Sequence, residues 1–156
     1  MAAEEKDGWL LLYSDGAARG NPGPAGIGGQ ALDEAGALLL EVSEFLGEAT
    51  NNVAEYWALA RLLELAGELG YSKVRIHTDS DLLANQVAGG YRVRSPSLKP
   101  LAARIKGMLE GYRAVEVVHI PREKNYKCDA LANEAIEGGL AGRVKPLLGE
   151  EESSLF

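Results

Sequence analysis

The chain has 156 residues, 46% of them hydrophobic, which is enough for one domain with a substantial core. It has no apolar run near the ~20 residues of a membrane span, and its acidic first eight residues do not resemble a secretory leader. Its single cysteine, Cys128, excludes an internal disulfide and a cysteine metal cluster. We therefore expect a cytoplasmic protein in which Cys128 lies on the apolar face of a helix and contributes to its packing.

The net charge of −7 at first argues against a nucleic-acid ligand. Most of that charge lies at the two ends, because residues 1–7 and 150–156 carry −5 and residues 8–149 carry only −2. Two divalent cations bound within residues 8–149 would change the charge of that part to +2. The charge therefore does not exclude nucleic acid.

The first predicted element is a strand that begins at Trp9. Five apolar residues, Trp9 to Tyr13, run without polar alternation, which suits a strand covered on both faces. This run is followed by Asp15, which we place at or near the end of the strand. A buried ionised carboxylate requires a cation or hydrogen bonds. The alternative is that Asp15 only begins a turn, because Asp-Gly is a common turn pair.

Two further strands are predicted at 25–32 and 37–46, joined by a turn at 33–36, although glycines at 26, 28 and 29 weaken the first of them. A helix is predicted over 50–69. Its polar stripe contains Arg61 and Glu64, and Glu55 lies about 150° from that stripe at 100° per residue. Glu55 is therefore expected to face the apolar side.

The rest of the chain predicts a strand at 73–79, helices at 82–87 and 98–109, a strand at 115–120 and a helix at 129–136. The strand-helix-strand order over residues 9–79 predicts two parallel strands, so Asp15 and Asp79 would project from the same end of the sheet. Asp129 would begin the last helix. The sequence therefore predicts a mixed α/β fold with four acids at element ends or on a core-facing side.

Four blocks of the sequence resemble ribonuclease HI in order and spacing, and each block contains one of the four acids. The blocks are Tyr13–Gly26, Thr50–Tyr56, His77–Ser80 and Pro121–Asn133. The resemblance covers 9–136, so we expect an acidic extension at 1–8, a catalytic domain at 9–136 and a C-terminal tail at 137–156. It implies a ribonuclease H-like fold, with a mixed five-stranded sheet, three antiparallel strands first, and helices on both faces.

The implied activity is a metal-dependent endonuclease that hydrolyses the RNA strand of RNA/DNA hybrids to 5′-phosphate and 3′-hydroxyl products. By the resemblance, Asp15 would contact two ions, Glu55 and Asp79 would hold the ion on the nucleophile side, and Asp129 would hold the other. Oxygen-only ligands favour Mg²⁺, with Mn²⁺ as a substitute. The alternative is a set of unrelated surface acids.

Residues expected to bind the substrate come from the same blocks and from one loop. Asn21, Asn51 and Asn52 match positions that hydrogen-bond the hybrid across its minor groove, where a 2′-hydroxyl distinguishes RNA from DNA. Thr50 matches a contact to a DNA-strand phosphate. These four residues also suit helix capping and turn formation, and the two roles are compatible.

The sequence departs from the family pattern near residue 122 and in the loop 89–99. Many family members have a loop histidine before the last Asp, whereas this chain has Arg122, which suits a phosphate or is a plain surface arginine. His119 alternates with Val117 in an apolar strand pattern, which favours a structural histidine. Many bacterial family members have a long basic helix and loop that grip the hybrid. By comparison, we expect the loop 89–99, with Arg92 and Arg94, to be a reduced hybrid-contact loop or simply a solvated loop.

One further family position differs, because Asp81 stands where a substrate-contacting glutamine is common. Two other function classes stay open: a different nuclease or integrase of the superfamily, and a catalytically silent hybrid-binding module. The acidic tail ends in Leu155 and Phe156, which loosely resemble peptides that dock into a sliding clamp. A tail that is disordered or packed on the domain is the alternative.

Overall fold

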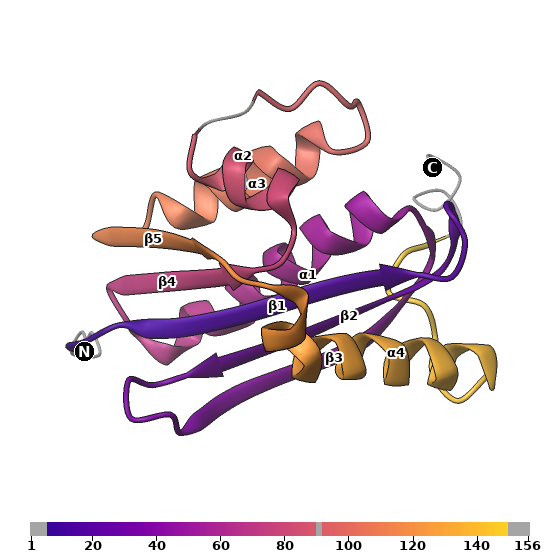
Figure 1. Ribbon diagram of the computed structural model, residues 1–156, viewed down its shortest axis with the longest axis horizontal. Coiled ribbons are helices and arrows are strands. Elements are labelled where there is room, and N and C mark those ends of the chain that lie inside the picture. Colours follow the sequence, from indigo (N-terminus) through magenta and orange to yellow (C-terminus); the bar gives the residue numbers. More distant parts are fainter. Residues whose placement is uncertain (1–5, 90–91, 150–156) are drawn as a thin grey trace.

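The computed structural model describes residues 6–89 and 92–149, and it contains a five-stranded mixed sheet with helices on both faces (Figure 1). The sheet order is β3-β2-β1-β4-β5. The strands are β1 (Leu10–Ala18), β2 (Gly23–Leu32), β3 (Leu38–Ala49), β4 (Lys73–Thr78) and β5 (Ala114–His119). The helices are α1 (Asn51–Ala66), α2 (Asp81–Val87), α3 (Lys99–Leu109) and α4 (Tyr126–Leu140), with short 3₁₀ helices η1 (Gly67–Leu69) and η2 (Arg122–Asn125).

The strand directions confirm the predicted topology. β1 pairs antiparallel with β2, and β2 pairs antiparallel with β3. β1 also pairs parallel with β4, and β4 pairs parallel with β5. The first three strands are therefore a meander, and α1 is the crossover that makes β4 parallel to β1.

The prediction that Asp15 lies near the end of a strand was wrong, because β1 continues to Ala18. Asp15 pairs with Gly28 of β2 inside the antiparallel ladder. The parallel pairing with β4 stops earlier, at Tyr13 and His77. Asp15 therefore lies where β1 runs past the end of β4, and this leaves space beside it for groups that follow β4.

The glycines of β2 let two helices approach opposite faces of the same strand. A Cβ on Gly28 would collide with the backbone of Cys128 in α4. A Cβ on the next residue, Gly29, would meet Leu62 of α1. Because successive residues of a strand face opposite sides, α4 and α1 cover the two faces of β2, as Figure 1 shows. The glycines that weakened the strand prediction are thus explained by close helix packing.

The main hydrophobic core lies between the sheet and α1, and α3 packs against α1 and adds buried side chains to it. Its fully buried side chains include Leu10, Leu12, Ile76 and Leu59. Cys128 is also buried on α4, as expected, where its thiol donates to the Tyr13 carbonyl oxygen at 3.3 Å. The strand predicted as covered on both faces is indeed the centre of the sheet.

The C-terminal part differs from the predicted boundaries. α4 begins three residues before Asp129 and continues to Leu140, so the domain boundary predicted at residue 136 falls inside a helix. After α4, the backbone N–H groups of Leu147 and Leu148 donate to Phe45 and Leu46 of the edge strand β3, at 2.8 and 3.0 Å. The folded unit therefore continues at least to Leu148, whose side chain is buried. The predicted clamp anchor, Leu155 and Phe156, lies outside the described residues.

Within residues 6–89 and 92–149, none of the helices combines the length and the apolar character needed to cross a bilayer.

Candidate active site

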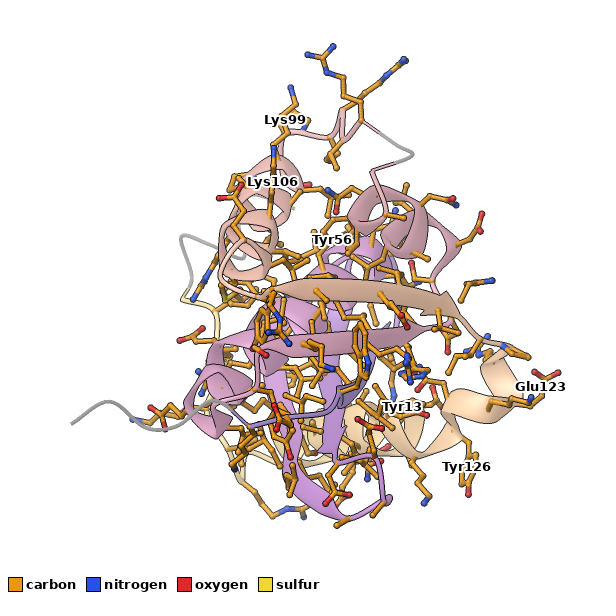
Figure 2. The ribbon with its side chains drawn as sticks, turned by 90° about the vertical axis from the view of Figure 1, so that its left-hand side faces the viewer. Tyr13, Tyr56, Lys99, Lys106, Glu123 and Tyr126 are labelled. Carbon is orange, nitrogen blue, oxygen red and sulfur yellow. The ribbon has the colours of Figure 1, made fainter. Side chains whose placement is uncertain are left out.

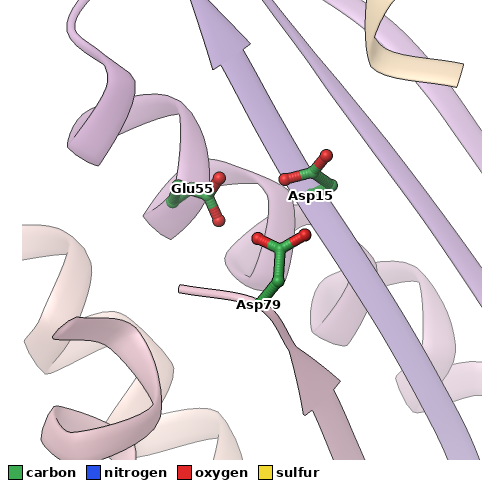
Figure 3. Close-up of side chains that lie close together, drawn as sticks. All are labelled: Asp15, Glu55 and Asp79. Atoms are coloured by element: carbon green, nitrogen blue, oxygen red, sulfur yellow. The ribbon is translucent and has the colours of Figure 1, made fainter. Parts of the chain in front are cut away.

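Three carboxylates meet beside the end of β4, one from each of three elements. Asp15 comes from β1, Glu55 from α1, and Asp79 directly follows β4. One oxygen atom of each lies within 4.8 Å of the others, and the three groups point toward one another (Figure 3). Glu55 thus faces inward, as its helical position predicted. Residues distant in the sequence therefore create one compact oxygen cluster.

Burial and mutual repulsion make this cluster costly to ionise. Burial, with the charges of Asp79 and Asp129, raises the pKa of Asp15 from 3.8 to about 7. Burial and the negative charge of Asp15 also hold the pKa of Glu55 well above its usual value. Because the side chain of Asp15 is only 4% exposed, water does little to screen this repulsion.

The donor set fits a hard divalent cation. All ligand atoms are oxygens, which Mg²⁺ and Mn²⁺ prefer. The Oε2 atom of Glu55 is buried without a hydrogen-bond partner among the described residues, so the protein leaves one carboxylate oxygen unsatisfied at the cluster. A bound cation would satisfy that oxygen and cancel part of the repulsion, as the sequence-based hypothesis requires.

Asp129 and Arg122 line the same open cleft as the three clustered acids. The cleft has a volume of about 510 Å³, and its wall also includes Asn51, Asn52 and Asn133. Asp129 is in the first turn of α4, and Arg122 begins η2. The structure thus brings together the four predicted carboxylates, the predicted arginine and two predicted asparagines.

Asn21 and Thr50 do not line the cleft but shape its edge. The Oδ1 atom of Asn21 accepts from the Asn51 backbone N–H at 3.1 Å, and the Oδ1 atom of Asn51 accepts from Ala18 N–H at 3.0 Å. Thr50 caps α1, since its hydroxyl oxygen accepts from Val53 N–H at 3.2 Å. The predicted capping role of Thr50 is confirmed, and the asparagines join the β1–β2 turn to the start of α1.

Arg92 and Arg94 line a neighbouring cavity instead. This cavity has a volume of about 680 Å³ and includes Asn52, which also lines the cleft, so the two hollows adjoin. Both arginines are exposed, and residues 90–91 of the same loop lie outside the described residues. Figure 2 shows Lys99 and Lys106 projecting from α3, which follows this loop. Arg92 and Arg94 are therefore beside the cleft rather than inside it.

His119 is exposed, although its apolar strand pattern suggested a covered position, and its structural role stays a prediction. β5 is an edge strand, and His119 is exposed at its end, with Nε2 3.2 Å from the Asp79 carbonyl oxygen. The buried histidine is His77, whose Nδ1 is 3.0 Å from the Leu12 carbonyl oxygen and whose ring stacks on Tyr13. The alternation of His119 with Val117 therefore did not predict burial of the histidine.

Two asparagines near the carboxylates were missed by the sequence analysis. Asn133 lines the cleft, and its Nδ2 donates to the Asp129 carbonyl oxygen at 2.9 Å. Its spacing of four residues from Asp129 places both residues on one helix face, so the sequence could have predicted that Asn133 lies near the carboxylates. Asn125 is buried and donates a hydrogen bond to Asp79. Its position in a polar stretch of the sequence did not predict this contact.

A mixed five-stranded sheet with an oxygen cluster between β1, α1 and β4 defines the class of ribonuclease H-like, metal-dependent phosphodiesterases. The family model described as "Reverse transcriptase-like" matches residues 13–135. Ribonuclease HI from Halobacterium salinarum is 38% identical over 133 residues, which cover 85% of this chain and 67% of that protein. The chain therefore belongs to the ribonuclease HI family, whose members are metal-dependent enzymes.

Two further comparisons support this assignment. The crystal structure of LC11-RNase H1 in complex with an RNA/DNA hybrid has a TM-score of 0.80 and 46% identity, covering 84% of this chain and 99% of that one. A bifunctional protein from Mycobacterium tuberculosis is 35% identical over 82% of this chain, and the chain spans 35% of that longer protein. The match therefore concerns the ribonuclease H-like domain.

Proposed function

We propose that this chain is an endoribonuclease that hydrolyses the RNA strand of RNA/DNA hybrids. The observation that carries the proposal is the compact cluster of Asp15, Glu55 and Asp79 in an open cleft, in a fold shared with a relative whose structure holds a hybrid. Water would add to phosphorus while the bond to the 3′-oxygen breaks. The products would be a 3′-hydroxyl, which receives a proton, and a 5′-phosphate.

Mg²⁺ is the proposed cofactor, with two ions in the presence of substrate and Mn²⁺ as a substitute. Asp15 would serve both ions, Glu55 and Asp79 one, and Asp129 the other. When bound, the ions would activate the water and stabilise the leaving oxygen. The four side chains contribute fixed oxygen ligands, and Arg122 on the same cleft wall would hold a phosphate oxygen with its fork of N–H donors.

Substrate selection is proposed to come from the α1 end of the cleft. The amide nitrogens of Asn51 and Asn52 would reach the 2′-hydroxyl of RNA, with Asn21 holding Asn51 in place. Thr50 uses its oxygen as the cap acceptor, so its hydroxyl hydrogen remains available for a DNA phosphate. Arg92 and Arg94 would hold the backbone of the hybrid beside the cleft.

The test is cleavage of a set of labelled substrates by purified protein. The set contains an RNA/DNA hybrid, duplex RNA, duplex DNA and both single strands, each with Mg²⁺, Mn²⁺ or EDTA. We expect cleavage of the hybrid's RNA strand with either metal and none with EDTA. Equal cleavage of all duplexes would favour another nuclease of the superfamily, and binding without cleavage would favour a silent hybrid-binding module.

A further inference from the structure

Asn125 joins two of the elements that carry the catalytic carboxylates. It ends η2 and is only 2% exposed. Its side-chain Nδ2 atom donates to the Ser14 carbonyl oxygen at 2.9 Å and to Asp79 Oδ2 at 3.2 Å. One buried amide thus contacts both the residue before Asp15 on β1 and the carboxylate that follows β4.

The orientation of this amide is fixed by its surroundings. If the amide were turned over, its oxygen would face the Ser14 carbonyl oxygen and the Asp79 carboxylate, and neither of these can donate a hydrogen bond. In the observed orientation both N–H groups of Asn125 are used. Its direction therefore follows from the hydrogen bonds that it makes.

Stability alone does not explain an asparagine at this position. The Oδ1 atom of Asn125 is buried without a hydrogen-bond partner among the described residues. An unpaired buried acceptor costs free energy that an apolar side chain of similar size would avoid. The favourable polar contacts of Asn125 are therefore those of its N–H groups, one of which donates to Asp79.

Asp79 needs such support because little else fixes its side chain. It follows the last residue of β4, and among residues 6–89 and 92–149 it has no ion pair. His119 contacts its backbone carbonyl oxygen rather than its carboxylate. Repulsion from the neighbouring acids favours rotation of the Asp79 carboxylate away from the cluster. A donor on Oδ2 opposes that rotation.

We propose that Asn125 is a positioning residue that holds the Asp79 carboxylate ready to bind a divalent cation together with Asp15. The proposal rests on the proposed function of the same site. Asn125 donates to Oδ2 of Asp79, so in the proposed role the other carboxylate oxygen, Oδ1, would be left for the metal. Partners of this kind orient ligands, and their loss typically weakens metal affinity by about 10–100-fold.

The experiment measures Mn²⁺ affinity of the free protein by electron paramagnetic resonance, without nucleic acid. Asn125→Leu removes the N–H donors and the unpaired oxygen while keeping the size, and Asn125→Ala serves as a second variant. The control is Asn85→Ala, because Asn85 also donates a side-chain hydrogen bond to a backbone carbonyl, that of Asp81. We expect affinity to fall about tenfold or more in the Asn125 variants and to remain unchanged in the control.

A double-mutant cycle separates positioning from general loosening of the fold. In an Asp79→Asn background, a further Asn125→Leu change should leave Mn²⁺ affinity unchanged, because the group that Asn125 supports has lost its charge. Circular dichroism confirms that each variant is folded at the assay temperature. Unchanged Mn²⁺ affinity of a folded Asn125 variant, or an equal loss in the Asp79→Asn background, would overturn the proposal.

A negative result for Asn125 can be distinguished from a failure of the proposed endoribonuclease function. Hybrid cleavage by the wild-type protein is measured separately. If the wild-type protein cleaves hybrid and the Asn125 variants bind Mn²⁺ normally, only the role of Asn125 is rejected. If the wild-type protein does not cleave hybrid, the enzyme assignment is rejected whatever the variants show.

Discussion

Replacing Asp15 by asparagine should abolish hybrid cleavage and, without metal, make the protein more stable. Asp15 is 4% exposed, and burial and neighbouring acids raise the pKa of its carboxyl group from 3.8 to about 7. Since one pKa unit corresponds to about 1.4 kcal/mol, ionised Asp15 destabilises the folded state by at most about 4 kcal/mol. A neutral amide of the same shape removes that repulsion but also removes a metal ligand.

The sign of the pH dependence follows from the raised pKa. Below about pH 4, Asp15 is protonated in both the folded and the unfolded chain, so it contributes no penalty. Between about pH 4 and 7 only the unfolded chain ionises, so wild-type stability falls as pH rises. Above pH 7 the full penalty persists. The advantage of Asp15→Asn should therefore be small at pH 4 and largest at pH 8.

Thermal unfolding in EDTA at pH 4 and pH 8 tests this reasoning. At pH 8 the melting temperature of Asp15→Asn should exceed that of the wild-type protein by several degrees, at about 2–4 °C per kcal/mol for a chain of this size. Asp7→Asn is the control, because Asp7 is exposed and outside the cleft. Mg²⁺ should narrow the difference by stabilising the wild-type protein more. A stability difference that is equal at both pH values would contradict the raised pKa of Asp15, and wild-type turnover by the variant would contradict its role as a metal ligand.

Three more outcomes are expected. Arg122→Ala should lower kcat/KM on hybrid about tenfold without changing the melting temperature, and wild-type kinetics would contradict its placement at the phosphate. His119→Ala should change stability by no more than about 0.5 kcal/mol, because the side chain is exposed, and denaturant unfolding measures this. Gly28→Ala should destabilise the protein by several kcal/mol, because the added methyl group would overpack against the α4 backbone. Gly107→Ala, with open space around its Cβ position, should instead stabilise the protein by up to about 1 kcal/mol. Equal melting temperatures for these two variants would count against close packing of β2 on α4.

The order of the elements could be predicted because the sequence signals were local. Apolar runs gave the strands, and the position of Glu55 opposite the polar stripe of its helix correctly indicated that it faces inward. The resemblance supplied the antiparallel start of the sheet, which periodicity alone could not give. Both kinds of signal agree with the observed strand order.

The errors arose where long-range packing decides the outcome. Asp15 pairs with Gly28 inside the antiparallel ladder of β1 and β2, whereas the Asp-Gly pair alone indicated the end of a strand. The exposure of His119 was also not predictable, because β5 has a neighbouring strand on one side only and sequence alternation does not show which strand lies at the edge of the sheet. α4 is longer than the predicted range 129–136 because residues on both sides of that range, Cys128 and Gly139, also pack on the sheet.

Asn125 shows the same limit at the level of a single side chain. Its proposed positioning role depends on hydrogen bonds to two acceptors, Ser14 and Asp79, that are 111 and 46 residues away along the chain. No local pattern reports such a pair. The carboxylates themselves were identifiable because each sits in its own short block, whereas their supporting contacts are visible only after folding.

Anomalous diffraction from crystals grown with Mn²⁺ and an uncleaved hybrid would show whether the cluster of carboxylates holds the metal ions of the proposed cleavage reaction. We expect two manganese peaks about 3.5–4 Å apart, both beside Asp15, with Glu55 and Asp79 at one, Asp129 at the other, and an RNA phosphate next to both. A bound hybrid whose RNA phosphates lie away from this cleft, with no manganese peak between Asp15 and Asp79, would contradict it.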